Sequence, residues 1–326
     1  MSAAPRRPSG TPNVADVLLS GTVFFDLIFS GLPSRPGPGR EIRTESLGSS
    51  PGGAANVAVA LRRLGLRVRL DAAFATDIYG DYLWRTLAEQ EDIDLAGSVR
   101  FPGWRTPLTV SLAYEADRSM VTYEEPQPAT LLGFLDDPRP ARSLFAFLGG
   151  HDIAWVERAA RRGMRIFADV GWDGSERWAE EDLAALSHCE AFMPNAGEAM
   201  AYTRTGSPEA ACRALARRVG SAVVKCGPDG AIACRAGSDQ LIREPALQVE
   251  AVDPTGAGDV FDAAFTYAAL GDWPLAETLR FANLCAGLSV RHLGGSLSAP
   301  TWSEIATWVR AHAPGDERYE FLRPHH

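Results

Sequence analysis

The chain has 326 residues, of which 46% are hydrophobic, and a formal net charge of -9 at pH 7. This length can bury a large core, either as one large α/β domain or as one domain with a small appendage. The negative charge argues against a nucleic-acid-binding surface. Lys225 is the single lysine, so the chain lacks the Gly-x-x-x-x-Gly-Lys-Ser/Thr loop of P-loop nucleotide-binding proteins.

The ends of the chain and its cysteines suggest where the protein works. Residues 1–14 are rich in Pro, Ser, Ala and Arg, and we expect a disordered tail there, with a second tail at 313–326. Asp16 and Asp26 interrupt the apolar stretch near the N-terminus, which argues against a signal peptide or a membrane-spanning helix. The five cysteines form no Cys-x-x-Cys pair, which favours reduced thiols. We therefore expect a cytoplasmic protein with no membrane partner.

Strand and helix patterns alternate along most of the chain. We expect strands at 17–24, 68–74, 144–148, 165–167 and 222–224. We expect helices at 57–64, 79–90, 155–162, 256–270 and 275–291. This alternation predicts right-handed βαβ units in one α/β domain over residues 15–312, with a mostly parallel central sheet flanked by helices.

Two regions depart from this alternation. Residues 27–47 hold three prolines among short extended pieces. Residues 106–123 predict a hairpin, with strands at 107–114 and 120–123 and a turn at 115–118. The alternating pattern from Thr109 to Tyr114 favours a half-exposed sheet. The two regions are either surface loops or a small second sheet.

A first turn of small residues precedes the helix at 57–64. Gly52 and Gly53 carry no side chain, so a polar ligand can lie against their backbone. Asn56 stands at the first turn of the helix, where it either caps the helix or offers its amide to hydroxyl groups.

A second turn of small residues, at 253–259, precedes the long helix that follows it. Gly256, Ala257 and Gly258 leave the backbone N–H groups of a helix start open to an anion such as phosphate. Asp259 on the same turn would repel that anion, unless its task is to take a proton from the group that attacks it. The alternative is an ordinary helix start with a favourable acidic residue.

The two turns together resemble the signatures of the ribokinase-like (PfkB) carbohydrate kinases, and the resemblance runs from about Val17 to about Trp308. Asn195-Ala196-Gly197-Glu198 resembles the Asn-x-x-Glu motif of the family, which helps to organise magnesium. Residues 225–230 resemble the strand–turn–strand that borders the nucleotide. Asp26 falls where the family has a sugar-binding aspartate.

The resemblance implies an ATP-dependent sugar kinase in which 27–47 and 106–123 form a small β-sheet lid over the sugar. It implies that Asp259 is the general base, and that the N–H groups of Gly256, Ala257 and Gly258 hold the negative charge that develops during transfer. Its implied sugar ligands are Asp26, Gly52, Gly53 and Asn56. Its implied nucleotide-binding residues are Lys225, Gly227, Gly230, Thr255 and Asn283.

The resemblance also implies cations and a partner. Asn195 and Glu198 would organise Mg²⁺, although the same pair can be read as a capping box at a helix start. The loop 291–296 lies where some members of the family bind a monovalent cation, so K⁺ is a further expectation. The family often pairs lids between subunits, which implies a homodimer joined through the lid.

Three alternatives remain open. A nucleoside kinase of the same family would share every motif above. A non-catalytic relative usually loses the aspartate found here at 259. A dinucleotide-dependent oxidoreductase needs a Gly-x-Gly-x-x-Gly after the first strand, which the chain lacks. Residues 169–173 also depart from the Asp-x-Asn-x-Arg of several sugar kinases, which argues against an acidic keto sugar, and within them we expect Trp172 to be buried.

Overall fold

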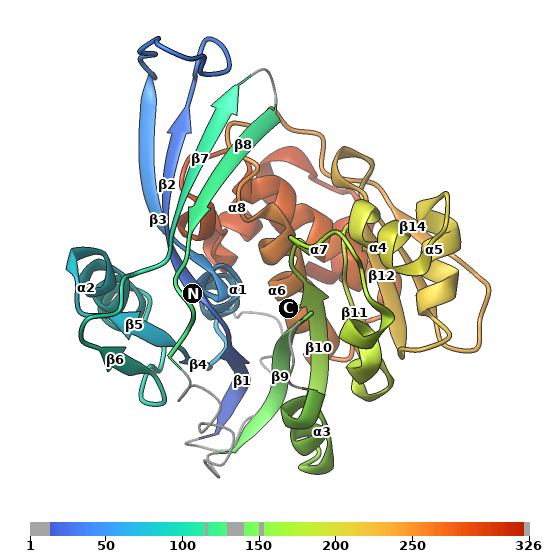
Figure 1. The fold of residues 1–326 in the computed structure, drawn as a ribbon. Helices are drawn as coiled ribbons and strands as arrows, with labels where there is room; N and C mark the ends of the chain where they lie inside the picture. The colour runs from blue at the N-terminus through green and yellow to red at the C-terminus, as the bar shows by residue number, and fades with distance from the viewer. Residues whose placement is uncertain (1–13, 115–116, 129–139, 150–152, 323–326) are drawn as a thin grey trace.

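The computed structural model describes residues 14–114, 117–128, 140–149 and 153–322. Its centre is an eight-stranded sheet in the order β14-β13-β12-β11-β10-β9-β1-β4 (Figure 1). These strands are β1 (Ala15–Ser20), β4 (Val68–Asp71), β9 (Ala141–Leu148), β10 (Arg165–Val170), β11 (Ala191–Phe192), β12 (Ser221–Lys225), β13 (Ala231–Arg235) and β14 (Ile242–Glu244).

The central sheet is mostly parallel, which confirms the predicted fold class. Strands β4, β1, β9, β10, β11 and β12 pair in parallel, and only β13 and β14 are antiparallel. The carboxyl ends of parallel strands meet at one edge of a sheet, and ligands of α/β proteins bind at that edge. Asp169, Asn195 and Lys225 therefore lie along the same edge, at or just beyond the ends of β10, β11 and β12.

Helices cover both faces of this sheet. The helices on one face are α1 (Ala54–Arg63), α2 (Ile78–Arg85), α6 (Ala257–Leu270), α7 (Leu275–Ser289) and α8 (Trp302–His312). Those on the other are α3 (Ile153–Arg161), η3 (Glu180–His188), α4 (Ala196–Thr203) and α5 (Pro208–Leu215). Strand β1 shows why both faces are buried: Val17 and Leu19 belong to one apolar cluster, and Leu18 belongs to the other.

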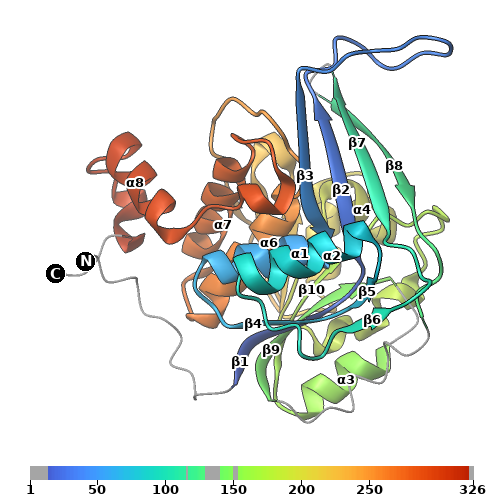
Figure 2. The same ribbon diagram turned by 90° about the vertical axis from the view of Figure 1, so that its left-hand side faces the viewer.

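A second sheet of four strands projects from the domain (Figures 1 and 2). Its order is β3-β2-β7-β8, with β2 (Val23–Ser30), β3 (Ser46–Gly53), β7 (Leu108–Tyr114) and β8 (Asp117–Tyr123). The predicted hairpin of 107–123 is therefore confirmed, but its second strand begins at Asp117, inside the turn predicted at 115–118. Residues 115 and 116 of that turn lie outside the described residues. We call this sheet the lid.

The first predicted strand is wrong in one respect. Residues 17–24 do not form one strand, because β1 ends at Ser20 and β2 begins at Val23. The chain bends at Gly21 and Thr22, where a Cβ atom on Gly21 would lie 3.1 Å from the Cβ of Ala54 at the start of α1. As a result β1 belongs to the central sheet, whereas β2, with Asp26, belongs to the lid.

Smaller features complete the domain. Strands β5 (Ala73–Ala75) and β6 (Val99–Phe101) form a two-stranded sheet, and the helix predicted at 79–90 continues from α2 into a π-helical turn, Thr86–Gln90. Part of the expected C-terminal tail is ordered: Glu317–Leu322 form a 3-10 helix, and the Phe321 ring lies 5.3 Å from that of Trp273. Residues 1–13, expected to be a disordered tail, lie outside the described residues.

The five cysteines are free thiols, and Cys226 alone among them is not fully buried. In the part of the chain that the structure describes, no helix is long and apolar enough to cross a membrane.

Candidate active site

The site is built around the N-terminus of α6. Gly256 stands at the N-cap with φ of 76°, a left-handed conformation that suits glycine, and as a glycine it has no side chain to cap the helix. Asp253, just before it, accepts a hydrogen bond from the Thr255 N–H at 2.9 Å and so closes the preceding turn. The Ala257 N–H donates to the carbonyl oxygen of Pro254 at 3.3 Å, so among the described residues it is the N–H groups of Gly256 and Gly258 that remain for a ligand, as an anion site requires.

The start of α1 forms the opposite wall. Gly53 has φ of 61°, and a Cβ atom on it would lie 2.4 Å from the carbonyl oxygen of Thr22. A Cβ atom on Gly52 would lie 2.1 Å from Oδ2 of Asp26, so the carboxylate of Asp26 packs directly on this turn. Two of the predicted sugar-binding residues, Asp26 and Gly52, are thus in contact.

Asn56 joins the two turns. Its Nδ2 donates a hydrogen bond of 2.8 Å to Oδ2 of Asp259, although 203 residues separate the two in sequence. Its Oδ1 is buried and has no hydrogen-bond partner among the described residues. The structure therefore brings the two glycine turns and both predicted polar residues, Asn56 and Asp259, to one place.

Lys225 lies beneath the α6 turn, and its side chain does not point freely into a nucleotide site. Its Nζ donates to Oδ2 of Asp169 at 2.9 Å and to Oδ1 and Oδ2 of Asp262 at 3.0 and 2.8 Å. Burial alone would lower the pKa of Lys225, but the two carboxylates outweigh it and raise the pKa above its usual value. Burial, and then Asp169, raise the pKa of Asp262 well above its usual range.

Asn195 and Glu198 form the capping box that the sequence allowed as an alternative. Asn195 Oδ1 accepts from the Glu198 N–H at 3.0 Å, and Glu198 Oε2 accepts from the Asn195 N–H at 2.9 Å. Burial, and then the charge of Asp169, raise the pKa of Glu198 to about 7. Asp169 Oδ1 is also buried and, among the described residues, has no hydrogen-bond partner.

These carboxylates fit a hydrated divalent cation better than a fully protein-bound one. No group of three or more His, Cys, Asp and Glu side chains within the described residues is arranged to hold a metal. Mg²⁺ usually keeps several waters and uses one or two carboxylates together with substrate phosphates. Glu198, with Asp169 beside it, fits that pattern.

A cavity of about 280 Å³ lies next to the α6 turn, between α6, α7 and the turn that connects β12 to β13. Its lining includes the predicted nucleotide-binding residues Lys225, Gly227, Gly230 and Asn283, together with Ala257 and Gly258. Asn283 Nδ2 donates to the carbonyl oxygen of Glu244 at 2.9 Å, which fixes its side chain against β14. Thr255 is not part of this lining, and its buried Oγ1 has no hydrogen-bond partner among the described residues.

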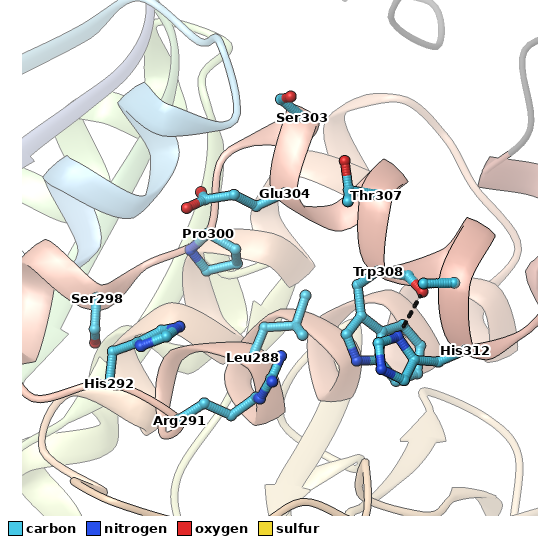
Figure 3. A pocket seen from close by; sticks show the side chains of 11 residues that line it. Leu288, Arg291, His292, Ser298, Pro300, Ser303, Glu304, Thr307, Trp308 and His312 are labelled. Atoms are coloured by element: carbon cyan, nitrogen blue, oxygen red, sulfur yellow. Dashed lines mark hydrogen bonds between the residues drawn. The ribbon is translucent and has the colours of Figure 1, made fainter.

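A second cavity of about 280 Å³ lies on the other side of the end of α7 (Figure 3). It is lined by Arg291, His292 and Trp308 and shares no lining residue with the first cavity. The side chains of Arg291 and His292, at the start of the loop 291–296, therefore line the second cavity and not the first. Farther along the loop, Gly294 N–H donates to Asp253 Oδ2 at 3.3 Å, and Ser296 Oγ donates to the carbonyl oxygen of Pro51 at 2.7 Å.

Two residues of the site were missed from the sequence. Asp262 could have been found because it follows Asp259 by three residues, which places both on one side of α6. Asp169 ends a buried strand at the ligand-binding edge of the sheet. The expectation that Trp172 is buried is wrong: it is 69% exposed and lies edge-on against Trp178, with ring centroids 5.1 Å apart.

Comparison with known proteins identifies the family. The family model described as pfkB family carbohydrate kinase matches residues 16–134 and 151–302. The chain is 29% identical over 298 residues to a nucleoside kinase of Methanothermobacter thermautotrophicus, covering 89% of this chain and 94% of that protein. It is 28% identical over 316 residues to a ribokinase of Bacillus subtilis, covering 89% and 98%. A putative ribokinase II of Escherichia coli, solved with ATP and Mg²⁺, shares the fold with a TM-score of 0.77 at 21% identity, covering 92% of this chain and 100% of that one. The chain belongs to the pfkB family of carbohydrate kinases.

Proposed function

We propose that this kinase transfers the γ-phosphoryl group of ATP to a hydroxyl group of a small sugar, with Asp259 as the general base. The observation that carries the proposal is the position of Asp259. It lies in the first turn of a helix that no side chain caps, and Asn56 of the other glycine turn donates to it. A carboxylate held beside an anion site is unfavourable unless it takes up a proton during the reaction.

The chain's own residues supply positioning and charge stabilisation, which dominate phosphoryl transfer. Asp26, Gly52, Gly53 and Asn56 hold the sugar so that one hydroxyl faces Asp259. Asp259 accepts the proton of that hydroxyl as its oxygen attacks the γ-phosphorus. The N–H groups of Gly256, Ala257 and Gly258 donate to the phosphoryl oxygens, where negative charge develops.

The nucleotide and the cation have separate places in this proposal. The cavity beside Gly227, Gly230 and Asn283 takes the adenosine part of ATP, and because Ala257 and Gly258 also line it, the phosphates would reach the α6 turn. Thr255 closes that turn through its backbone and acts indirectly. Mg²⁺ held near Asn195 and Glu198 would neutralise phosphate charge.

A nucleoside is the second candidate for the acceptor, because the nucleoside kinase named above is as similar to this chain as the ribokinase is. ADP release across pentoses, hexoses, polyols and nucleosides separates the two. We expect the highest kcat/KM with a free sugar. A nucleoside that surpassed every sugar would reverse the assignment, and no acceptor-dependent ADP release at all would refute kinase activity.

The sharpest prediction concerns Asp259→Asn. Asparagine has nearly the same size and keeps an acceptor for Asn56, so folding and sugar binding should survive. It cannot take the hydroxyl proton, so kcat should fall by ~10²–10⁴-fold while KM changes less. Steady-state kinetics with a thermal-melting control measure both effects.

Asp26→Ala provides the contrast, because it removes ground-state contacts to the sugar and should raise the sugar KM. Asp316→Asn, on the far C-terminal segment, should leave the kinetics unchanged. If Asp259→Asn melts normally and retains kcat within a few-fold of the wild type, Asp259 is only a helix-start residue.

Cations give a further prediction. We expect turnover to stop in excess EDTA and to return with Mg²⁺. We also expect K⁺ to raise the rate over a bulky organic cation, because Asp253 is buried, accepts only backbone N–H groups of Thr255 and Gly294, and has no basic side-chain partner among the described residues. Full activity in EDTA would refute the metal requirement, and equal rates in both monovalent cations would refute the role of K⁺.

We also propose a homodimer joined through the lid. β8 is an edge strand of the lid, and its Met120, Val121 and Tyr123 side chains are 56%, 65% and 45% exposed. Uncovered apolar edge strands are a liability that association removes. Light scattering at high protein concentration should give twice the chain mass, and Val121→Glu should give the monomer. The control Ala311→Glu, on α8, should remain dimeric; a monomeric wild type would contradict the proposal.

A further inference from the structure

We propose that Lys225 is a positioning residue for phosphoryl transfer: it ties Asp262 of α6 to Asp169 of β10 and so fixes the helix turn that carries Asp259. The inference rests on the proposed function, since it assigns Lys225 a part in that reaction. It also replaces the expectation that the Lys225 side chain binds the nucleotide.

The hydrogen bonds of the ammonium group are the first step. An ammonium has three N–H donors, and the structure gives Nζ three carboxylate acceptors, one oxygen of Asp169 and two of Asp262. No donor is then left for a phosphate. The Lys225 side chain is only 12% exposed, and that of Asp262 is fully buried. The ammonium of Lys225 therefore uses its hydrogen bonds to hold the carboxylates of Asp169 and Asp262 together.

The second step is the place of Asp262 on the helix. Residues three apart lie on the same side of a helix, nearly one turn from each other. A Cβ atom on Gly258 would lie 3.5 Å from Nζ of Lys225, so the first turn of α6 packs directly on the ammonium. Fixing Asp262 consequently fixes Gly258 and Asp259 relative to the sheet.

The third step is that the first turn of α6 must be held in place by contacts from neighbouring elements. The N-cap of α6 is Gly256, which has no side chain with which to cap the helix. Asn56 holds the turn from α1 through Asp259, and Lys225 holds it from β12 through Asp262. These two contacts come from different elements and fix the turn in two directions.

The ionic character of the contacts of Lys225 with Asp169 and Asp262 suits a positioning role better than a stabilising one. Buried ion pairs seldom stabilise a fold more than well-packed apolar residues of the same size, so they are weak devices for stability. They do fix geometry, because an ammonium holds its acceptors at hydrogen-bond distance. A lysine ammonium also suits three acceptors around one point better than the planar guanidinium of arginine does. Lys225 is nevertheless the only lysine of the chain, and all its other Lys or Arg positions are arginine.

The test compares Lys225→Met with the double variant Lys225→Met/Asp262→Leu. The single variant leaves two buried carboxylates without their cation, so it should lower the melting temperature. The double variant removes one of those carboxylates but leaves Asp169 without its cation, so it should recover only part of the lost melting temperature. Arg69→Met is the matched control, since Arg69 and Asp71 form another buried ion pair at 2.8 Å, in the strand at the far edge of the sheet.

A positioning role predicts a particular pattern of kinetics and binding. In both Lys225 variants kcat should fall by about 10²-fold, since small misplacements of reacting groups have effects of that size. The dissociation constant of a non-hydrolysable ATP analogue with Mg²⁺ should stay within about threefold. Arg69→Met should lose thermal stability and keep its kcat below its melting temperature.

Two results would overturn the inference. Restored kcat in the double variant would make the role of Lys225 purely structural. An analogue dissociation constant raised tenfold or more in Lys225→Met would make it a nucleotide ligand.

The wild type offers a readout that needs no variant. Because Lys225 is the single lysine, labelling with [ζ-¹⁵N]lysine gives one ammonium signal. We expect that signal to persist almost unshifted when the analogue binds; a large shift would indicate phosphate contact. If the wild type phosphorylates no acceptor, the proposed function fails by itself, and the NMR result still reports which groups hold Lys225.

Discussion

The start of α6 must stay uncapped, and the rest of the site depends on that constraint. A side chain that capped this helix would occupy N–H groups that, in the proposed reaction, bind the phosphoryl group. A glycine in place of a capping side chain typically costs only a few tenths of a kcal/mol. The helix is held instead by its apolar body, most of which is buried, and by the contacts of Asn56 and Lys225 with its first two turns. The contacts that stabilise α6 are thus separate from the backbone N–H groups proposed to bind the ligand.

The proposed sugar-binding residues lie on the lid and on the helix that follows it. Asp26 lies on β2 and Gly52 on β3, and β3 leads directly into α1 and Asn56. Ser296 of the loop after α7 bonds to the carbonyl oxygen of Pro51, and its hydroxyl lies 2.8 Å from that of Ser50. Through Gly294 the same loop reaches Asp253. A movement of the lid would therefore displace the loop after α7 and, through Gly294, change the position of Asp253 in the turn before α6.

The sequence allowed us to predict the glycine turns and the alternation of strands and helices, because both leave a local pattern. It did not reveal features that depend only on contacts between distant parts of the chain. Gly52, Gly53 and Gly256 were found because close backbone approach and positive φ leave a local signal. The break between β1 and β2 was missed because both strands are apolar, and only the packing of Gly21 against α1 separates them. The partners of Lys225 were missed because Asp169 and Asp262 are distant in sequence, and the family resemblance suggested the nucleotide instead.

The balance of charge in the site bears on the form in which the proposed nucleotide would bind. Asp169, Glu198, Asp259 and Asp262 influence one another, and Lys225 is the cation that bridges two of them. A bare triphosphate would meet a net negative charge here, which the N–H groups of α6 offset only in part. A triphosphate that carries Mg²⁺ brings the missing positive charge, and it would also favour the ionised form of Glu198, whose pKa of about 7 leaves it close to protonation. Under the proposed function, the excess of carboxylates would favour the metal complex of the nucleotide over the free anion, while the single ammonium beneath the helix keeps two of those carboxylates from repelling each other.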